Sequence, residues 1–248
     1  MNPAHTIDLV VLEDYAALSR VGAARVAELF RAKPDAAVVV ATGNTPMGLY
    51  RELAAKRAAR VFGPGELKVF QLDAYLGLAP DDPRSLYRWT KEAFLDPLGI
   101  QPQQVVKLPG DSPDPAAACR AYDDAVVRAG GFDLAILGLG PNGHLGFNEP
   151  PSQPTDKTRV VSLSEASLES NARYWGGQGR VPKQALTAGM NVLLAAKEIV
   201  LLVSGAHKRD VLVQALAGPV TPDLPASYLQ TSSKVTVLAD RAAWDEHG

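Results

Sequence analysis

The chain has 248 residues, of which 46% are apolar, so it can bury a large core. Its 25 basic and 27 acidic side chains give a net charge of −2, which provides no electrostatic attraction to nucleic acid or to an anionic membrane. One cysteine excludes an intrachain disulfide, and no signal-peptide pattern or apolar run of roughly 18 residues is present. These features predict a cytoplasmic protein.

Short apolar runs alternate with segments of helical periodicity. In chain order we expect strands at 8–12, 36–41, 67–72, 105–108, 132–139, 198–204 and 234–239, and helices at 14–30, 46–59, 85–95, 116–129, 163–173, 183–196 and 208–217. Such alternation is typical of an α/β fold in which helices cover both faces of a mostly parallel sheet. Because no linker or repeat interrupts it, we predict a single domain over residues 1–248. Cys119 should be a small apolar residue of a helix.

The segment Thr42-Gly43-Asn44-Thr45-Pro46 joins the second strand to the second helix. Glycine lets the backbone approach an anion, and the free N–H groups of a helix N-terminus attract phosphate. The alternative is an ordinary turn in which Thr45 caps the helix. Lys208 also stands near a helix N-terminus, where a cation is unfavourable unless an anion is bound. The loop at 42–46 and Lys208 are therefore candidates for binding a phosphate group.

The segment Gly138-Leu139-Gly140-Pro141-Asn142-Gly143 matches the glycine pattern of dinucleotide-binding proteins. It runs into His144-Leu145-Gly146-Phe147-Asn148-Glu149-Pro150-Pro151, which cannot form a long regular helix, so we predict no NAD site. The glycines instead allow a tight loop in which Glu149 orients the His144 imidazole, as in acid–base sites. The alternative is a structural turn with a solvated Glu149.

Asp73 directly follows the strand predicted at 67–72, where a carboxylate can cap a turn or act as a general base. Ligands of open parallel sheets bind beyond the carboxyl ends of the strands. Polar clusters follow positions 41, 72, 139 and 204, so we expect them to meet in one crevice. The other histidines, His5, His207 and His247, should lie at the surface. The cysteine and histidines have no metal-ligand spacing, so no metal is expected.

Four motifs together resemble the glucosamine-6-phosphate deaminase (glucosamine/galactosamine-6-phosphate isomerase) family. They are Thr42-Gly43-Asn44-Thr45-Pro46-Met47, Leu72-Asp73-Ala74-Tyr75, the segment from Gly138 to Pro150, and Ala185-Leu186-Thr187-Ala188-Gly189. The similarity runs in order from about residue 41 to 240. The related 6-phosphogluconolactonases share the glycine-rich start but lack the Phe147-Asn148-Glu149-Pro150 continuation.

The resemblance implies a modified Rossmann-like fold and a reaction without metal or cofactor, from glucosamine 6-phosphate and water to fructose 6-phosphate and ammonia. It implies that Asp73 moves a proton between C2 and C1 and that His144, paired with Glu149, assists ring opening. Asn142 stands where some members have an aspartate that orients the histidine. The residues matched to the phosphate ligands are Gly43, Asn44, Thr45, Arg173 and Lys208.

Three alternatives stay open: a galactosamine-6-phosphate deaminase, a 6-phosphogluconolactonase, and a non-catalytic sugar-phosphate sensor. Residues 152–182 are the expected lid, because they join the catalytic loop to the next element and include Arg173. Allosteric members have a basic residue two positions after the one matching Arg159, and an extended C-terminus. Val161 stands there and the sequence ends soon after Asp240, so we do not expect allosteric activation. The oligomeric state, a homo-oligomer included, stays open.

Overall fold

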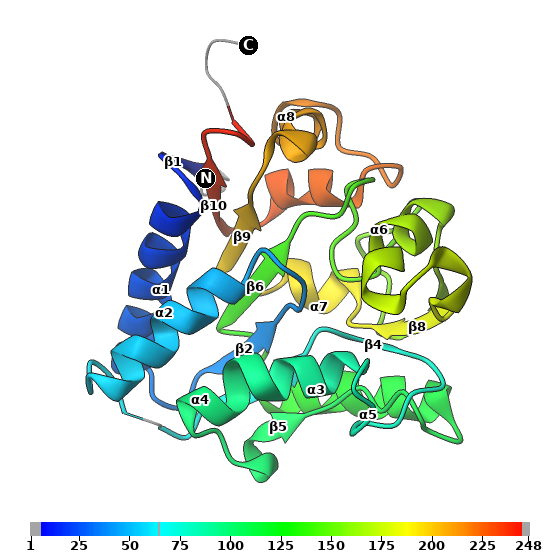
Figure 1. Cartoon of the computed structure of the whole chain (residues 1–248), viewed down its shortest axis with the longest axis horizontal. Helices are drawn as coiled ribbons and strands as arrows, with labels where there is room; N and C mark the ends of the chain where they lie inside the picture. Colours follow the sequence, from blue (N-terminus) through cyan, green and yellow to red (C-terminus); the bar gives the residue numbers. More distant parts are fainter. Residues whose placement is uncertain (1–5, 64, 245–248) are drawn as a thin grey trace.

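The computed structural model describes residues 6–63 and 65–244, and its centre is a seven-stranded sheet (Figure 1). The strand order is β1-β10-β9-β6-β2-β3-β5, and every neighbouring pair is parallel. The strands are β1 (Thr6–Leu12), β2 (Ala37–Val40), β3 (Lys68–Gln71), β5 (Val105–Val106), β6 (Leu134–Gly138), β9 (Ile199–Val203) and β10 (Lys234–Asp240). The predicted α/β fold with a mostly parallel sheet is confirmed.

Helices cover both faces of this sheet, as the alternation of elements predicts. They are α1 (Tyr15–Ala32), α2 (Met47–Ala58), α3 (Leu86–Thr90), α4 (Asp96–Leu98), α5 (Pro115–Arg128), α6 (Glu165–Trp175), α7 (Met190–Leu194) and α8 (Arg209–Ala217), with a π-helical segment, Lys91–Leu95, between α3 and α4. No helix of the described residues has the length and apolar character needed to cross a membrane.

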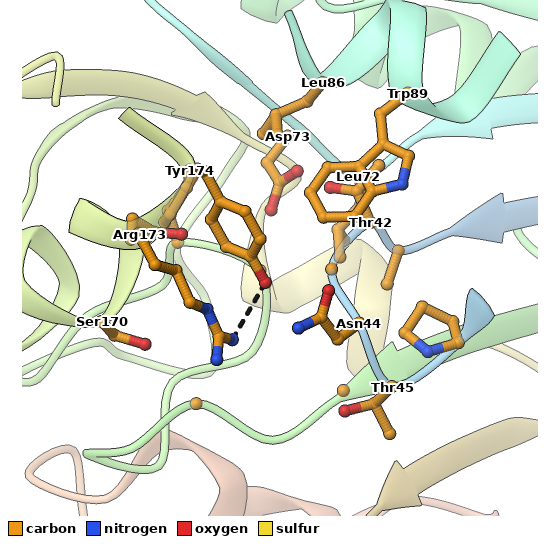
Figure 2. A pocket seen from close by; sticks show the side chains of 18 of the residues that line it. Thr42, Asn44, Thr45, Leu72, Asp73, Leu86, Trp89, Ser170, Arg173 and Tyr174 are labelled. Atoms are coloured by element: carbon orange, nitrogen blue, oxygen red, sulfur yellow. Dashed lines mark hydrogen bonds between the residues drawn. The ribbon is translucent and has the colours of Figure 1, made fainter. Parts of the chain in front are cut away.

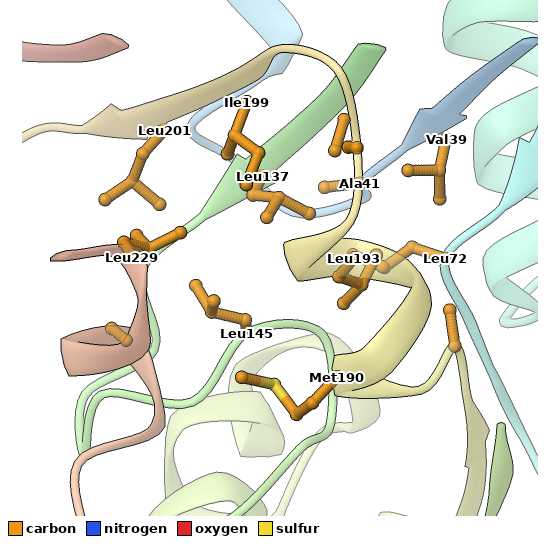
Figure 3. Packing of buried hydrophobic residues seen from close by; sticks show 14 of the residues in the cluster. Val39, Ala41, Leu72, Leu137, Leu145, Met190, Leu193, Ile199, Leu201 and Leu229 are labelled. Carbon is orange, nitrogen blue, oxygen red and sulfur yellow. The ribbon is translucent and has the colours of Figure 1, made fainter. Parts of the chain in front are cut away.

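The period-2 alternation of β2 divides the core into two layers. Val38 and Val40 pack with the buried side chains of α1 and α2. Val39 points to the other face, where it joins buried side chains of α5, α7 and α8 (Figure 3). Cys119 belongs to this second layer and is buried in α5, as its apolar surroundings predict.

The structure contains a second, smaller sheet that the sequence did not predict. Its three antiparallel strands are ordered β4 (Asp73–Tyr75), β8 (Gln184–Thr187) and β7 (Arg159–Ser162). The predicted helix at 183–196 is therefore wrong at its start: residues 184–187 form β8, and only 190–194 are helical, as α7. β8 pairs on both sides, and this pairing outweighs the helix propensity of its alanine and leucine.

Helix α6 packs beside the small sheet through a third apolar cluster that contains Tyr75, Leu168, Trp175 and Ala185 (Figure 1). Val161 lies partly buried against the same cluster. The small sheet and α6 therefore form a wall next to the carboxyl ends of β2, β3 and β6. His207 is exposed, as predicted, whereas the predictions for His5 and His247 concern positions outside the described residues.

Candidate active site

A cavity of about 810 Å³ lies beyond the carboxyl ends of the central strands (Figure 2). Segments that follow β2, β3, β6 and β9 all contribute to its lining, so the predicted convergence of four strand ends is confirmed. The predicted site residues in the lining are Gly43, Asn44, Thr45, Asp73, His144, Arg173 and Lys208. Asn142 and Glu149 are not part of the lining, and they contact one another behind His144.

Asp73 provides a buried carboxyl group at the cavity wall. The chain leaves the parallel sheet after Gln71 and enters β4 at Asp73, and the Gln71 side-chain amide donates to the Asp73 carbonyl oxygen at 2.7 Å. The side chain is 7% exposed, and its Oδ1 has no hydrogen-bond partner among the described residues. Burial raises the pKa of Asp73 to about 7. Such a carboxyl group can exchange protons near neutral pH.

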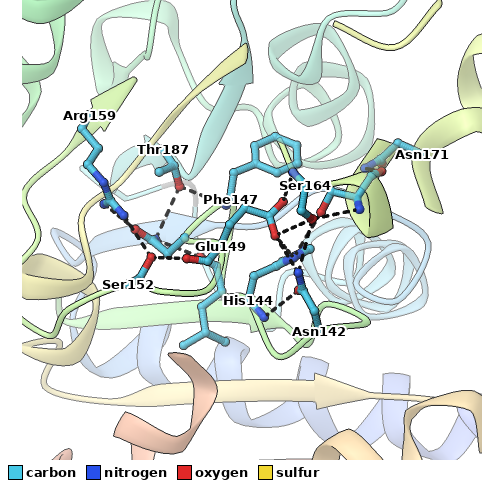
Figure 4. Close-up of polar contacts among 12 residues, drawn as sticks. Asn142, His144, Phe147, Glu149, Ser152, Arg159, Ser164, Asn171 and Thr187 are labelled. Carbon is cyan, nitrogen blue, oxygen red and sulfur yellow. Dashed lines mark hydrogen bonds and ion pairs between the residues drawn. The ribbon is translucent and has the colours of Figure 1, made fainter. Parts of the chain in front are cut away.

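His144 and Glu149 form the couple that the loop sequence predicts (Figure 4). His144 Nδ1 lies 3.3 Å from Glu149 Oε2, and the same oxygen accepts from Asn142 Nδ2 at 2.8 Å and from the Ser164 hydroxyl at 3.0 Å. Burial by itself would raise the pKa of Glu149, but hydrogen bonding and charge from His144 and neighbouring polar groups outweigh it and lower the pKa to about 2. Glu149 is only 9% exposed, so the alternative of a solvated glutamate is wrong.

The orientation of the His144 ring is fixed from two further sides. The Ser167 hydroxyl, on the first turn of α6, lies 3.3 Å from Nδ1. On the other side the ring packs directly on Gly140, where an added Cβ would come within 2.3 Å of Nε2. A glycine is therefore required at position 140. With Nδ1 facing Glu149, Nε2 is the nitrogen left to exchange a proton with a ligand.

Arg173 and Lys208 bring two positive charges to the cavity. Burial, together with repulsion from Arg173, lowers the pKa of Lys208 to about 8. Neither side chain forms an ion pair within the described part of the chain, although Arg173 donates to the Tyr174 hydroxyl at 2.9 Å. Two neighbouring cations without a counter-ion indicate a site for an anion.

The loop at 42–46, at the N-terminus of α2, lines the same cavity as these cations and lies opposite Arg173 (Figure 2). Pro46 is the N-cap of α2 and makes no capping hydrogen bond through its own side chain, so the alternative in which Thr45 is the cap is wrong. The first N–H groups of a helix have no partner inside it and favour a negative charge. The loop, Arg173 and Lys208 can therefore bind one phosphate group together.

Sequence reasoning missed Tyr15, whose hydroxyl shapes the loop at the α2 N-terminus. It accepts from the Gly48 N–H at 2.7 Å and lies 3.0 Å from the carbonyl oxygens of Asn44 and Thr45, to which it can donate. Trp89 was also missed. Its ring packs edge-on against the Tyr174 ring, with the two ring centroids 5.2 Å apart. No motif surrounds either residue, and 29 positions separate Tyr15 from Asn44, so only the fold reveals these contacts.

The sequence and the fold both match known proteins. Residues 13–238 match the family model described as glucosamine-6-phosphate isomerases/6-phosphogluconolactonase. Over 237 residues the chain is 42% identical to glucosamine-6-phosphate deaminase 2 of Bacillus subtilis, with 95% of each chain covered. It is 37% identical to the glucosamine-6-phosphate deaminase of Halothermothrix orenii, covering 95% of this chain and 98% of that one.

Solved structures agree. The structure of a monomeric glucosamine-6-phosphate deaminase superimposes with a TM-score of 0.93 at 37% identity, covering 96% of this chain and 98% of that one. The 6-phosphogluconolactonase of Leishmania guyanensis gives a TM-score of 0.76 at 22% identity, covering 97% and 98%, so it shares the fold. From the family model and the full-length relatives, the chain belongs to the glucosamine-6-phosphate isomerase/6-phosphogluconolactonase family.

Proposed function

We propose that this protein converts glucosamine 6-phosphate and water to fructose 6-phosphate and ammonia. The observation that supports it most directly is the buried Asp73 carboxyl, whose Oδ1 has no hydrogen-bond partner within residues 6–63 and 65–244, in the cavity that His144, Arg173 and Lys208 also line. Removal of a proton from C2 requires a base beside C2, whereas hydrolysis of a lactone removes no proton from C2. The relatives that are 37–42% identical are named deaminases, which favours the same choice within the family.

Binding of the phosphate is the first step of the proposed reaction. The loop at 43–45, Arg173 and Lys208 offer N–H groups and two positive charges to a dianion, and such charge-assisted hydrogen bonds are strong. Because the phosphate is attached at C6, its position fixes the far end of the sugar. The carbon chain then extends across the cavity toward Asp73 and His144, which turns proton transfer into a reaction between prepositioned groups.

His144 opens the sugar ring in the second step. Nε2 takes the proton of the anomeric hydroxyl group and returns a proton to the ring oxygen, so that C1 becomes an aldehyde. The imidazole is positively charged between these two transfers. Glu149, which is ionised and lies 3.3 Å from Nδ1, stabilises that charge and keeps Nδ1 protonated.

Asp73 transfers a proton from C2 to C1 in the third step. The ionised carboxylate removes the C2 proton, and the electrons are delocalised onto the aldehyde oxygen to give an enol-amine. Return of that proton to C1, with net transfer of one N–H proton to the C1 oxygen, produces a C1 hydroxyl group and an imine at C2. Water adds to the imine carbon, and the C2–N bond breaks to give the ketone of fructose 6-phosphate and ammonia. All atoms come from the substrate and one water molecule.

We further propose that residues 152–182 act as a lid over the bound sugar. This segment includes α6, which places Arg173 at the cavity and contacts Trp89 of α3 through Tyr174. It also includes Ser164 and Ser167, which contact Glu149 and His144. Closure of α6 on the phosphate, while β7 of the same segment stays paired with β8, would exclude water from the groups that transfer protons.

The proposed function predicts that ammonia is released from glucosamine 6-phosphate and not from glucosamine, because the unphosphorylated sugar lacks the group that the cations bind. Ammonia release is measured for both sugars and for galactosamine 6-phosphate, and hydrolysis of 6-phosphogluconolactone is measured in parallel. Preferred turnover of the galactosamine ester would change the epimer in the proposal. Lactone hydrolysis without ammonia release, or phosphate-dependent binding without any turnover, would replace it by the lactonase or the sensor.

The pKa values of Asp73 and Lys208 predict a bell-shaped dependence of kcat/KM on pH. Asp73 acts as a base only when ionised, so activity rises as the pH increases through about 7. Lys208 binds phosphate best when protonated, so activity falls as the pH increases beyond about 8. Initial rates at low substrate concentration between pH 5 and 10 test both limbs. A flat profile from pH 5 to 7 would contradict the role of Asp73 as base.

A further inference from the structure

Asp73, Thr187 and Arg159 lie in one row across the small antiparallel sheet. Thr187 in the middle strand β8 is paired with Asp73 in β4 and with Arg159 in β7. Directly opposite residues of neighbouring strands point to the same face of a sheet. The side chain that we assign as the base therefore shares a face with Thr187 and Arg159, which belong to no step of the proposed reaction.

The Thr187 hydroxyl contacts the loop that contains the His144–Glu149 couple (Figure 4). It accepts from the Phe147 N–H at 3.0 Å and lies 3.5 Å from the side-chain amide of Asn148. Thr187 is fully buried, so water cannot replace these bonds. The loop approaches so closely that a Cβ added to Gly146 would stand 3.0 Å from the hydroxyl oxygen. The hydroxyl thus connects the strand opposite Asp73 to the residues beside Glu149.

Arg159 contacts the same loop on both sides of Glu149. Its guanidinium donates to Asn148 Oδ1 at 2.8 Å and to the Ser152 hydroxyl at 3.0 Å. Ser152 in turn donates to the Glu149 carbonyl oxygen at 2.5 Å. Asn148 and Ser152 are fully buried, so their ends of these bonds are shielded from water. The Arg159 side chain itself is partly exposed, and its guanidinium also pairs with Asp156 at 3.1 Å and donates to the Lys157 carbonyl oxygen at 3.3 Å.

We propose that Thr187 is a positioning residue that sets the His144–Glu149 couple at its working distance from Asp73, with Arg159 supporting the same loop. The inference rests on the proposed function, because it assigns both groups to one substrate. Pairing of β4 with β8 holds Asp73 in place. The Thr187 hydroxyl in β8 and the Arg159 guanidinium in β7 hold the loop that contains His144 and Glu149. Loss of the hydroxyl lets the loop move relative to β4 without disturbing the phosphate ligands, none of which contacts Thr187.

Two substitutions at Thr187 separate the hydroxyl from the shape of the side chain. Thr187→Val keeps the size but cannot accept the Phe147 N–H, whereas Thr187→Ser keeps the acceptor. Because a misplacement of about 1 Å can reduce a rate by about 10²-fold, we expect Thr187→Val to lower kcat roughly 10- to 100-fold and Thr187→Ser to retain most activity. KM for glucosamine 6-phosphate should stay within about twofold in both variants, because the groups that bind the phosphate are unchanged.

Thr236→Val is the matched control. Thr236 is a buried threonine of β10, 1% exposed, whose hydroxyl has no hydrogen-bond partner in residues 6–63 and 65–244. The same substitution there removes an unpaired polar atom, and kcat should be unchanged. NMR adds a readout that needs no turnover: the ring resonances of His144 should shift and the Phe147 amide should exchange faster in Thr187→Val, but not in Thr187→Ser or Thr236→Val.

Wild-type kcat in Thr187→Val with unshifted His144 resonances would overturn the inference, as would equal losses in the valine and serine variants. If Thr187→Val does not fold, Arg159→Lys takes its place, because lysine keeps the charge but cannot contact Asn148 and Ser152 together. It should also lower kcat selectively, and an unchanged kcat would overturn the inference. If the wild-type protein releases no ammonia, the proposed function fails, and the His144 resonances alone decide the positioning role.

Discussion

Replacement of Asp73 by asparagine is expected to lower ammonia release by about 10²- to 10⁴-fold, the usual contribution of a general base. Asparagine has nearly the same shape but cannot accept the C2 proton. The phosphate ligands are unaltered, so the sugar phosphate should still bind. Incorporation of deuterium at C2 or C1 from deuterated water should be lost together with turnover. Substantial remaining exchange at C2 would remove Asp73 from the role of base.

Two comparisons distinguish a catalytic loss from a folding defect in this variant. Asp124→Asn removes an exposed carboxylate of α5 outside the cavity and should have wild-type activity. Asp73→Asn should also be more stable than the wild-type protein above about pH 7. The folded Asp73 carboxyl keeps its proton up to about pH 7, whereas the unfolded one releases it near 3.9, so wild-type stability falls as pH rises between these values. Thermal unfolding at pH 5 and pH 8 measures the difference.

Lys208→Ala is expected to increase KM for glucosamine 6-phosphate roughly 10- to 150-fold, because a hydrogen bond to a charged group contributes about 1.5–3 kcal/mol. Lys208 is a half-buried cation without an ion-pair partner in the described residues, so the phosphate is the partner that we expect it to gain. The kcat at saturating substrate should change much less, since the group lies at the far end of the sugar from C1 and C2.

The pH dependence of the same variant provides an internal test. The decrease of kcat/KM above about pH 8 should disappear in Lys208→Ala, because the group whose deprotonation causes it is absent. Lys68→Ala removes an exposed charge at the start of β3, outside the cavity lining, and should leave both KM and the alkaline limb unchanged. An unchanged KM in Lys208→Ala would show that the phosphate binds elsewhere.

The shared fold does not by itself choose between the chemistries of the family. The 6-phosphogluconolactonase structure superimposes over nearly the whole chain at 22% identity, so the sheet and its helices are common to both activities. Function depends on the groups placed at the strand ends. Here the groups on which the proposed function rests are a buried carboxyl at position 73 and a carboxylate at position 149 that contacts His144.

The central sheet and the place of the site could be predicted from the sequence alone. Buried strands such as β2 and β9 are continuous apolar runs, and their polar ends carry the cavity segments. These signals are local: hydrophobic periodicity and glycines within a few residues determine them. The proximity of His144 and Glu149, five positions apart in one glycine-rich loop, was predictable for the same reason.

The small antiparallel sheet was decided only by the tertiary structure. The segment at 184–187 contains helix-forming residues, and pairing with two strands distant in sequence, β4 and β7, outweighs that preference. The contact of Tyr15 with the loop at 44–45 and the row through Thr187 likewise join distant segments. Burial also raises the pKa of Asp73, and burial depends on what the rest of the chain packs around it. A sequence displays local preferences, whereas these properties arise from long-range contacts that exist only once the chain is folded.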